Sequence, residues 1–390
     1  MNPSRIVTLG CRLNLAESER IAAMLKHDRN TVVVNSCAVT NEAVRQTRQA
    51  IRRLRREHPD ARLIVTGCAS EIEREQFKAM PEIDGCIANA QKLDPRAWNL
   101  PAAPAGTRGQ HTRSFVGVQN GCDHACTFCI IPKGRGQSRS LPVAEVLHAI
   151  SADLDRGAKE VVLTGVDLTS WGHDLSQAPG LGVLVEHILA EFPDLSRLRL
   201  SSLDGIEVDD RLFDLLVHEE RVMPHVHLSL QHGHDLILKR MKRRHLRRDA
   251  IELVARLKSA RPDIAMGADL IAGFPTETEE HHRANNTLIK ELDIAHGHIF
   301  PYSPRAGTPA ARMPQIERAV VKRRAAELRE TVRRVREDWL VRHLDRPHRV
   351  LVEKDGHGYT PGYARVAAHD HQPGNIVTVT PGRVIDGVLT

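Results

Sequence analysis

The sequence predicts an α/β protein in three parts: an N-terminal parallel α/β domain over residues 1–102, a partial (β/α)6 barrel with a C-terminal helix over 112–344, and a small C-terminal β-barrel over 345–390. Three observations carry this prediction. Short β-branched runs alternate with helix-like segments in the first hundred residues, as they do in parallel sheets. Six further strand-like runs follow, with helical patterns between them. Short alternating strands with Gly and Pro turns end the chain, which favours a small β module.

The N-terminal domain repeats a unit of about thirty residues, as successive structural repeats do. The units are RIVTLGC, TVVVNSC and RLIVTGC, and each is a strand-like run that ends at a cysteine. Because the carboxyl ends of parallel strands share one edge of a sheet, we expect Cys11, Cys37 and Cys68 to converge there. One strand-end cysteine is usually only a small buried side chain, but three at equivalent positions predict a metal centre. Cys86 precedes its apolar residues, so we expect it to be structural.

The segment 100–113, LPAAPAGTRGQHTR, is rich in Pro, Gly and Ala and has no periodicity, and we place the domain boundary there. A long arginine-rich helical pattern over 317–344 is expected to pack across the barrel that follows. In such barrels the chemistry lies where the strands end. The strand-like runs of the barrel are SFVGVQ, EVVLTGV, RLRLSSL, HVHLSLQ, IAMGADLIAGF and GHIFPYSP.

The loop over 118–139, directly after the first of these runs, places Cys122, Cys126 and Cys129 within eight residues. Three thiolates leave a cubane iron–sulfur cluster or a structural zinc ion one ligand short of the usual four. An iron without a protein ligand can bind a substrate, so the loop predicts an open metal centre. The alternative is a structural zinc knuckle in which His124 or a distant residue supplies the fourth ligand.

Composition limits the classes of function. Seven cysteines are an odd number for a disulfide framework, and in a reducing compartment clustered cysteines more often bind metal or do chemistry. The N-terminal MNPSRIVTLGC has no apolar run of the kind found in signal peptides, and no stretch of eighteen uncharged apolar residues occurs. We therefore expect a cytoplasmic protein that does not bind a membrane.

The formal net charge is +6, the pI is near 9.0, and arginine outnumbers lysine heavily. Such a balance suits a polyanionic partner with phosphate groups. Solubilising surface and internal packing are the alternatives for these residues. The candidate RNA contacts are Arg135, Arg139, Lys242, Arg243 and Arg244 near the predicted mouth of the barrel, and Lys354, Tyr363 and Arg365 in the C-terminal module.

The cysteine loop, with Phe128 just before its last cysteine, resembles the signature of the radical S-adenosylmethionine (radical SAM) enzymes. TLGCRLN, NSCAVTNEA and VTGCASE resemble the three cysteine motifs of the methylthiotransferase domain, and GYARV resembles part of a TRAM domain. The strand-end motifs from LTGVDLTSWG to HIFPYSPRAGTPAARM resemble, in order, those of radical SAM methylthiotransferases. The chain departs from the family pattern at Trp171, His232 and His245, which bears on the details of substrate contact.

This resemblance implies two [4Fe-4S] clusters, one held by each cysteine trio with one iron left open, and SAM bound at the strand ends of the barrel. It also implies a tRNA anticodon stem-loop as substrate and an electron donor protein as partner. No classical base is expected, because the cofactors supply the reactivity. Small and polar residues after the strands let a cofactor approach, and the candidate SAM contacts are Thr164, Gly165, Asp167, Ser201, Gln231, Asp269 and Gly273.

Within the family, TLGCRLN, AVTNEAVRQTRQ and LTGVDLTSWG look most like the branch that acts on N6-threonylcarbamoyladenosine. That branch implies addition of a methylthio group at C2 of the base at position 37 of tRNA. Branches acting on N6-isopentenyladenosine or on an aspartate of a ribosomal protein are alternatives. A hypothesis of another class is a non-catalytic iron–sulfur or zinc protein that binds RNA. The sequence leaves the oligomeric state, the reductant and the sulfur donor open.

Overall fold

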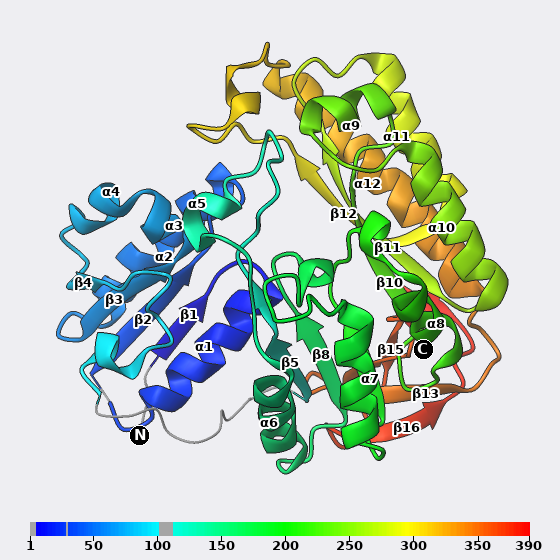
Figure 1. Ribbon diagram of the computed structural model, residues 1–390, viewed down its shortest axis with the longest axis horizontal. Coiled ribbons are helices and arrows are strands. Elements are labelled where there is room, and N and C mark those ends of the chain that lie inside the picture. The colour runs from blue at the N-terminus through cyan, green and yellow to red at the C-terminus, as the bar shows by residue number, and fades with distance from the viewer. Residues whose placement is uncertain (1–4, 29, 101–111) are drawn as a thin grey trace.

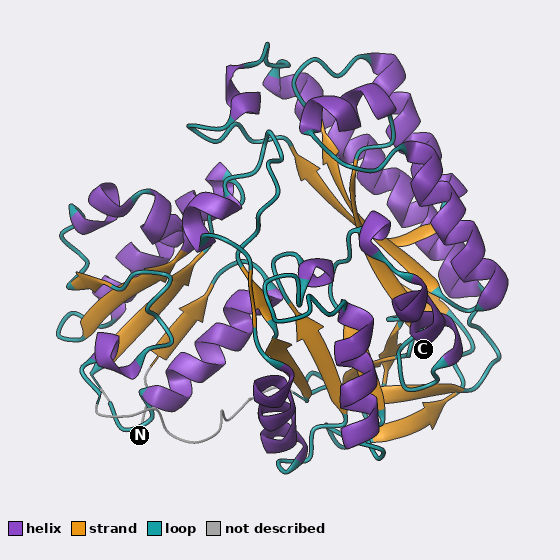
Figure 2. Cartoon of the chain, viewed as in Figure 1, coloured by secondary structure: helices purple, strands orange, loops and turns teal. Residues whose placement is uncertain are grey.

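The computed structural model describes residues 5–28, 30–100 and 112–390. The predicted domain boundary in 100–113 falls almost wholly outside these residues. Figure 1 shows the N-terminal domain in blue on one side, the green and yellow barrel beside it, and the orange and red C-terminal part against the barrel. Figure 2 shows helices along the outer faces of the strand layers. Among the described helices, none combines the length and apolar character that crossing a bilayer requires.

The N-terminal domain is a four-stranded parallel sheet in the order β1-β2-β3-β4, which confirms the predicted parallel α/β arrangement. Its core contains Val34, Ile51, Leu54 and Val65, because the β-branched strands are apolar on the faces that the helices cover. The elements are β1 (Arg5–Thr8), α1 (Arg12–Met24), β2 (Thr31–Ser36), α2 (Asn41–Glu57), β3 (Arg62–Gly67), α3 (Cys68–Ile72), α4 (Arg74–Lys78), β4 (Gly85–Cys86) and a 3-10 turn at Pro95–Trp98.

The barrel consists of two three-stranded parallel sheets, β5-β8-β9 and β10-β11-β12. Isolated bridges from Leu198 to Val222 and from Leu203 to Leu228 join the two halves. The predicted six strands are therefore all present, at β5 (Arg113–Gly117), β8 (Glu160–Thr164), β9 (Arg197–Leu200), β10 (His225–Gln231), β11 (Ala265–Ala272) and β12 (Ile294–Pro301).

Helices follow these strands and cover the outside of the barrel, with one large apolar core between helices and strands. They are α6 (Val143–Leu154), α7 (Leu181–Glu191), α8 (Asp210–His218), α9 (Asp235–Met241), α10 (Arg247–Ala260), α11 (Glu279–Glu291) and α12 (Arg318–Val341). Short 3-10 turns lie at Leu168–Ser170, Gly205–Glu207 and Pro309–Arg312. The long helix α12 packs along β12, as expected from its pattern: a Cβ on Gly297 would lie 2.5 Å from a methyl of Val332.

The C-terminal module is one six-stranded sheet in the order β16-β13-β14-β15-β18-β17. The predicted closed barrel is not confirmed, because no pairing between the outer strands β16 and β17 occurs among the described residues. Its strands are mostly short, since Gly and Pro turns interrupt them, and only β13 reaches five residues. They are β13 (His348–Val352), β14 (His357–Tyr359), β15 (Arg365–Ala367), β16 (Ile376–Val379), β17 (Val384–Ile385) and β18 (Val388–Leu389).

A buried carboxylate fixes this module to the barrel. Glu160, at the start of β8, accepts hydrogen bonds from Arg199 Nε and Nη2 at 3.0 and 3.1 Å. Arg199 also donates to the carbonyl of Pro361 at 2.7 Å, and Arg197 donates to that of Arg349 at 2.7 Å. Glu160 and Arg197 are the first residues of β8 and β9, so the module docks at the edge of the barrel opposite the strand ends.

Candidate metal centres

A short hairpin closes the loop that carries the first cysteine trio. Its strands β6 (Gln119–Asn120) and β7 (Arg139–Ser140) pair antiparallel. Gly121 has φ +77°, and a Cβ there would lie 1.9 Å from the carbonyl oxygen of Gln137, so only glycine fits. The Cys129 N–H donates to the carbonyl of Cys126 at 3.2 Å. The backbone thus gathers the thiols just before the short helix α5 (Ile131–Arg135).

Burial disfavours the charged forms of two thiols of this loop, Cys122 and Cys129. Burial raises the pKa of Cys122 to about 12 and that of Cys129 to about 11, and the neighbouring thiolates add to both shifts. Like charges in a small volume oppose one another, whereas a metal centre holds its thiol ligands deprotonated. The Arg243 guanidinium also lies 3.8 Å from Cys126 Sγ. The trio therefore supplies three thiols that a metal centre could hold deprotonated.

His124 does not complete this trio. Its Nε2 lies 2.7 Å from Asp167 Oδ2, and this hydrogen bond raises the pKa of the imidazole. Among the described residues, the group that includes His124 and a thiol and could hold an ion is Cys122, His124 and Asp167, which contains one cysteine only. His124 is therefore engaged by Asp167 rather than grouped with all three cysteines.

The structure brings the N-terminal cysteines together at one sheet edge. Cys11 caps α1 after β1, Cys37 follows β2, and Cys68 begins α3 after β3. Burial raises the pKa of Cys37, and the charges of Cys11 and Cys68 raise it further. A Cβ on Gly10 would lie 2.8 Å from Cys37 Sγ, so the first strand-end loop lies directly against the second cysteine. Three thiols at one sheet edge again fit a metal centre.

Polar side chains fix the backbone around these cysteines. The Ser36 hydroxyl oxygen accepts hydrogen bonds from the Ala69 and Ser70 N–H groups at 3.1 and 3.2 Å, which ties the loop of Cys37 to the helix of Cys68. Asn14 Nδ2 donates to the carbonyls of Leu9 and Ser36 at 2.7 and 3.1 Å. The serine of NSC and the asparagine of CRLN therefore position the three loops relative to one another.

The two trios lie on facing sides of the domain junction. A Cβ on Gly134 of α5 would lie 3.4 Å from Cys68 Cβ, and Asn89 Nδ2 donates to the Gly134 carbonyl at 2.6 Å. The charge of Cys68 contributes, after burial and Cys126, to the raised pKa of Cys129. Figure 1 shows α3 and α5 side by side. Cys86 stays apart, in the core of the N-terminal sheet beside Val65.

The predicted cofactor contacts lie at or near the ends of β8 to β11, except Asp269 within β11, and they differ in whether another side chain already occupies their polar atoms. Ser201 Oγ is buried and has no hydrogen-bond partner among the described residues, so it is available to a ligand. Asp167 is engaged by His124 and by Ser170 Oγ at 2.7 Å. Thr164 is buried at the end of β8, and Gln231 ends β10 with φ +68°.

Two of the predicted glycines are already accounted for by packing. A Cβ on Gly165 would lie 2.9 Å from Gln119 Oε1, and one on Gly273 would lie 2.6 Å from a methyl of Val321. Gln119 Oε1 also accepts from the N–H groups of Val166 and Asp167 at 3.0 and 2.9 Å. Close packing requires glycine at both positions whether or not a cofactor is near.

Asp269 belongs to a carboxylate–histidine cluster that was not predicted from the sequence. Its Oδ1 lies 3.0 Å from His227 Nε2 and 3.0 Å from His298 Nδ1, so adjacent strands β10, β11 and β12 each contribute one residue. The two histidines lower the pKa of the carboxyl against the effect of burial. The alternation of histidines in HVHLSL and HGHIF could have revealed this cluster, because alternate residues of a strand share a face.

Three predicted RNA contacts are corrected by their burial. The side chains of Arg135 and Arg243 are 2% and 7% exposed and pair with Glu17 and Asp204. Tyr363 is buried against His225 and Arg199. Arg139 and Lys242 are exposed, as is Lys354. Arg244 is 44% exposed beside Asp204 and Glu207, and Arg365 is 38% exposed beside Asp355.

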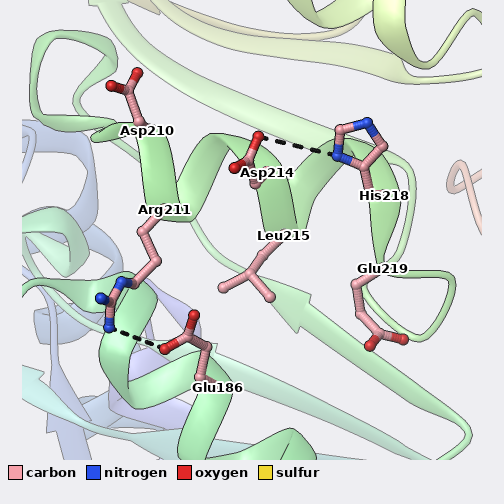
Figure 3. A pocket seen from close by; sticks show the side chains of 7 residues that line it. All are labelled: Glu186, Asp210, Arg211, Asp214, Leu215, His218 and Glu219. Carbon is pink, nitrogen blue, oxygen red and sulfur yellow. Dashed lines mark hydrogen bonds and ion pairs between the residues drawn. The ribbon is translucent and has the colours of Figure 1, made fainter.

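The surface hollow in Figure 3 is not part of the site. Its lining comes from α7, α8 and the residue after α8, and it contains the ion pairs Arg211–Glu186 and His218–Asp214. These residues are on the outer helical layer, away from both cysteine trios.

The partial parallel barrel and the cysteine loop at its strand ends define a radical SAM protein. A model of the radical SAM superfamily matches residues 116–286, and a model of the uncharacterized protein family UPF0004 matches residues 4–88. The radical SAM methyltransferase TsrM from Kitasatospora setae, with cobalamin and a [4Fe-4S] cluster bound, has the same fold, with a TM-score of 0.54, 18% identity, and coverage of 77% of this chain and 68% of that chain.

Relatives of known name narrow the class of radical SAM protein to which the chain belongs. The threonylcarbamoyladenosine tRNA methylthiotransferase MtaB of Rickettsia prowazekii is 41% identical over 93% of this chain and 90% of its own length. The tRNA-2-methylthio-N(6)-dimethylallyladenosine synthase of Erythrobacter litoralis is 31% identical over 90% of this chain and 86% of its own length. The chain belongs to the radical SAM tRNA methylthiotransferase family. It is thus a transferase that uses SAM and [4Fe-4S] clusters.

Proposed function

We propose that this enzyme adds a methylthio group at C2 of N6-threonylcarbamoyladenosine at position 37 of tRNA. The 41% identity to a relative named for threonylcarbamoyladenosine supports this substrate over isopentenyladenosine, for which the relative described above is 31% identical. The motifs TLGCRLN and LTGVDLTSWG support the same branch. The proposal includes a cytoplasmic location, the anticodon stem-loop as the bound part of tRNA, and an electron donor protein. The three domains are proposed at 1–102, 112–344 and 345–390.

One observation carries the proposal: the segments that carry the two cysteine trios meet where α3 lies against α5. We assign one [4Fe-4S] cluster to Cys122, Cys126 and Cys129 and the other to Cys11, Cys37 and Cys68. When bound, the barrel cluster and SAM supply a radical that removes hydrogen from an unactivated carbon, and the second centre supplies the sulfur. Adjacent centres let one substrate carbon meet both reagents.

The chain's own residues bind and orient the reactants. Ser201 Oγ, buried and without a partner, is placed to bond SAM. Asp167 holds His124 beside the first trio. Thr164, Gln231 and Asp269 complete the proposed lining, whereas Gly165 and Gly273 act by permitting close packing.

The proposed RNA surface consists of Arg139, Lys242, Arg244, Lys354 and Arg365. The first three lie at the strand-end side of the barrel. A TRAM-like role for the C-terminal module would use its exposed residues rather than Tyr363, which is buried at the docking surface.

Mass spectrometry of tRNA nucleosides tests the substrate. A strain lacking the protein should lose the 2-methylthio form of threonylcarbamoyladenosine and accumulate the unmodified nucleoside, and the wild-type chain should restore it. A Cys126→Ala chain is the matched control, because it lacks one barrel-cluster ligand and should not restore it. Loss of the methylthio form of isopentenyladenosine instead would move the enzyme to that branch. Unchanged tRNA nucleosides together with a change in a ribosomal protein would assign the enzyme to the branch that acts on a ribosomal protein aspartate.

A further inference from the structure

A buried ion network crosses the junction between the two segments that carry the cysteine trios. The Arg135 guanidinium, at the end of α5, donates to Glu17 Oε1 and Oε2 at 2.9 and 3.1 Å. It also donates to Asn14 Oδ1 at 2.5 Å and Asn120 Oδ1 at 2.7 Å. Glu17 and Asn14 belong to α1 of the N-terminal domain, whereas Arg135 and Asn120 belong to the barrel segment that carries the first trio. One arginine therefore spans the domain junction.

A second cation completes the network. Lys92 Nζ lies 2.5 Å from Glu17 Oε2, and the two side chains are 1% and 4% exposed. Burial raises the pKa of Glu17, but Lys92 and Arg135 lower it overall, so the carboxylate is charged. One carboxylate thus faces two cations in a place with little water. Two cations and one anion leave a positive balance there, which a buried network rarely carries without a further anionic partner.

The network lies beside the N-terminal cysteines. A Cβ on Gly134, the residue before Arg135, would lie 3.4 Å from Cys68 Cβ. Asn14, which accepts from Arg135, donates to the carbonyl of Ser36, the residue before Cys37, at 3.1 Å. Lys92 Nζ also donates to Asn35 Oδ1, two residues before Cys37, at 3.4 Å. The thiols of this trio are therefore placed to supply the missing negative charge.

We propose that Arg135, assisted by Lys92, balances the charge of the metal centre held by Cys11, Cys37 and Cys68 and so sets its reduction potential. This inference rests on the ligand set proposed above. A four-iron cluster with three thiolate ligands is anionic, and reduction makes it more so. A buried cation stabilises the reduced form more than the oxidised form, because the local dielectric is low. Arg135 thus acts through the cluster as a positioning residue.

The test uses the full chain with Cys122, Cys126 and Cys129 replaced by alanine, so that only the N-terminal centre is loaded. Each protein is reconstituted anaerobically, its iron is counted, and the cluster is titrated electrochemically with detection by electron paramagnetic resonance. The variants in this background are Arg135→Gln, Arg135→Lys, Lys92→Met and Glu17→Gln. Arg139→Gln is the matched control, since it removes the same charge from the same segment at an exposed side chain.

About four irons per chain are expected in the parent protein, as one cubane requires. Arg135→Gln should lower the reduction equilibrium constant about tenfold, which is a shift of about 59 mV to more negative potential for one electron. Lys92→Met should shift the potential in the same direction, and Arg135→Lys should restore most of it. Glu17→Gln should shift the potential positively, because it removes the compensating anion. Arg139→Gln should leave it unchanged.

Opposite shifts for Arg135→Gln and Glu17→Gln separate a charge effect from a structural one. If both variants shift the potential the same way, or neither shifts it while iron is retained, the inference is overturned. If the Arg135→Gln chain takes up no iron, the potential shifts of Lys92→Met and Glu17→Gln decide instead. Opposite shifts support the inference, and shifts in the same direction, or no shift in either variant, overturn it. A parent protein without iron would instead overturn the ligand set, and this inference with it.

Discussion

At the scale of single residues, the cysteines of this enzyme are distinguished by their neighbours. Six of them occur as two trios, in which the charges of neighbouring thiolates raise the pKa of Cys37 and of Cys122, whereas Cys86 lies beside Val65 in the N-terminal sheet. Such trios are unfavourable as bare thiolates and favourable around metal.

Removing one trio should halve the iron. Substitution of Cys11, Cys37 and Cys68 by alanine should lower the content from about eight irons per chain to about four after anaerobic reconstitution, as two cubanes and one cubane require. Reductive cleavage of SAM to 5′-deoxyadenosine should persist in this variant, because the barrel trio is intact. Cys86→Ala is the control and should keep about eight irons. Retention of all the iron without the N-terminal trio would contradict the second centre.

Ser36→Ala should loosen the helix that begins at Cys68. The substitution leaves the buried N–H groups of Ala69 and Ser70 without their acceptor, and an unsatisfied buried group costs about 1–3 kcal/mol. Amide hydrogen exchange at Ala69 and Ser70 should become faster, and the midpoint of urea unfolding should fall. Ser259→Ala, at an exposed position of α10, should change neither. Equal protection of Ala69 and Ser70 in both variants would exclude this role.

At the scale of elements, the two ends of the parallel strands have different roles: the cysteines lie at the carboxyl ends, and the contacts between domains lie at the amino ends of the barrel strands. Both trios follow strand ends, whereas the C-terminal module docks on the strand starts of the barrel through Glu160, Arg197 and Arg199. Four backbone carbonyls of the module accept from the two arginines. The docking therefore depends on one buried charge that keeps both guanidinium groups in place.

Glu160→Gln should destabilise this junction strongly. It leaves Arg197 and Arg199 buried without their anion, and breaking a buried pair by removing one partner costs about 3–5 kcal/mol. Urea unfolding followed by Trp339 fluorescence, at the docking core, should report the loss. Glu186→Gln removes an exposed partner of Arg211 and should change stability by less than about 1 kcal/mol.

The Glu160 carboxyl also makes the stability of the protein depend on pH in a predictable direction. Burial raises the pKa of Glu160, but Arg199 and its neighbours lower it overall from 4.5. A lowered folded-state pKa gives a contribution that is fully present above the ordinary value and is lost as the pH falls through the folded value. The stability difference between the wild-type chain and Glu160→Gln should therefore be constant near neutral pH and shrink only in acid below 4.5. A difference that grows in acid would contradict this assignment.

At the scale of the whole molecule, the positive charge is used in two ways. Many positive side chains form buried ion pairs, as Arg135, Arg199 and Arg324 do. The rest is exposed, and part of it lies on the side of the barrel where the first trio is found. Only this second group can release counterions when tRNA binds.

Replacing Arg139 and Lys242 together by glutamine should weaken tRNA binding and lower its salt dependence. Each lost phosphate contact should reduce the slope of log K against log salt by about 0.9 for a duplex stem and about 0.7 for a single strand. Filter binding or fluorescence anisotropy between 50 and 200 mM salt, about the range over which such contacts are screened, measures it. Lys26→Gln, exposed just after the end of α1, is the control and should leave the slope unchanged. An unchanged slope in the double variant would place the RNA surface elsewhere.

The sequence by itself determined the strands, the six cysteines that follow them and the family, because strand-end position is a local property that β-branched runs and small residues specify. Only the tertiary structure decided which polar residues are exposed to solvent and which are buried. Arg135, Arg243 and Tyr363 are as polar as any exposed residue in the sequence, yet distant segments bury them. It also decided that the two trios face each other through Gly134 and Cys68. Burial and contact depend on which elements pack together, and no local pattern records that choice.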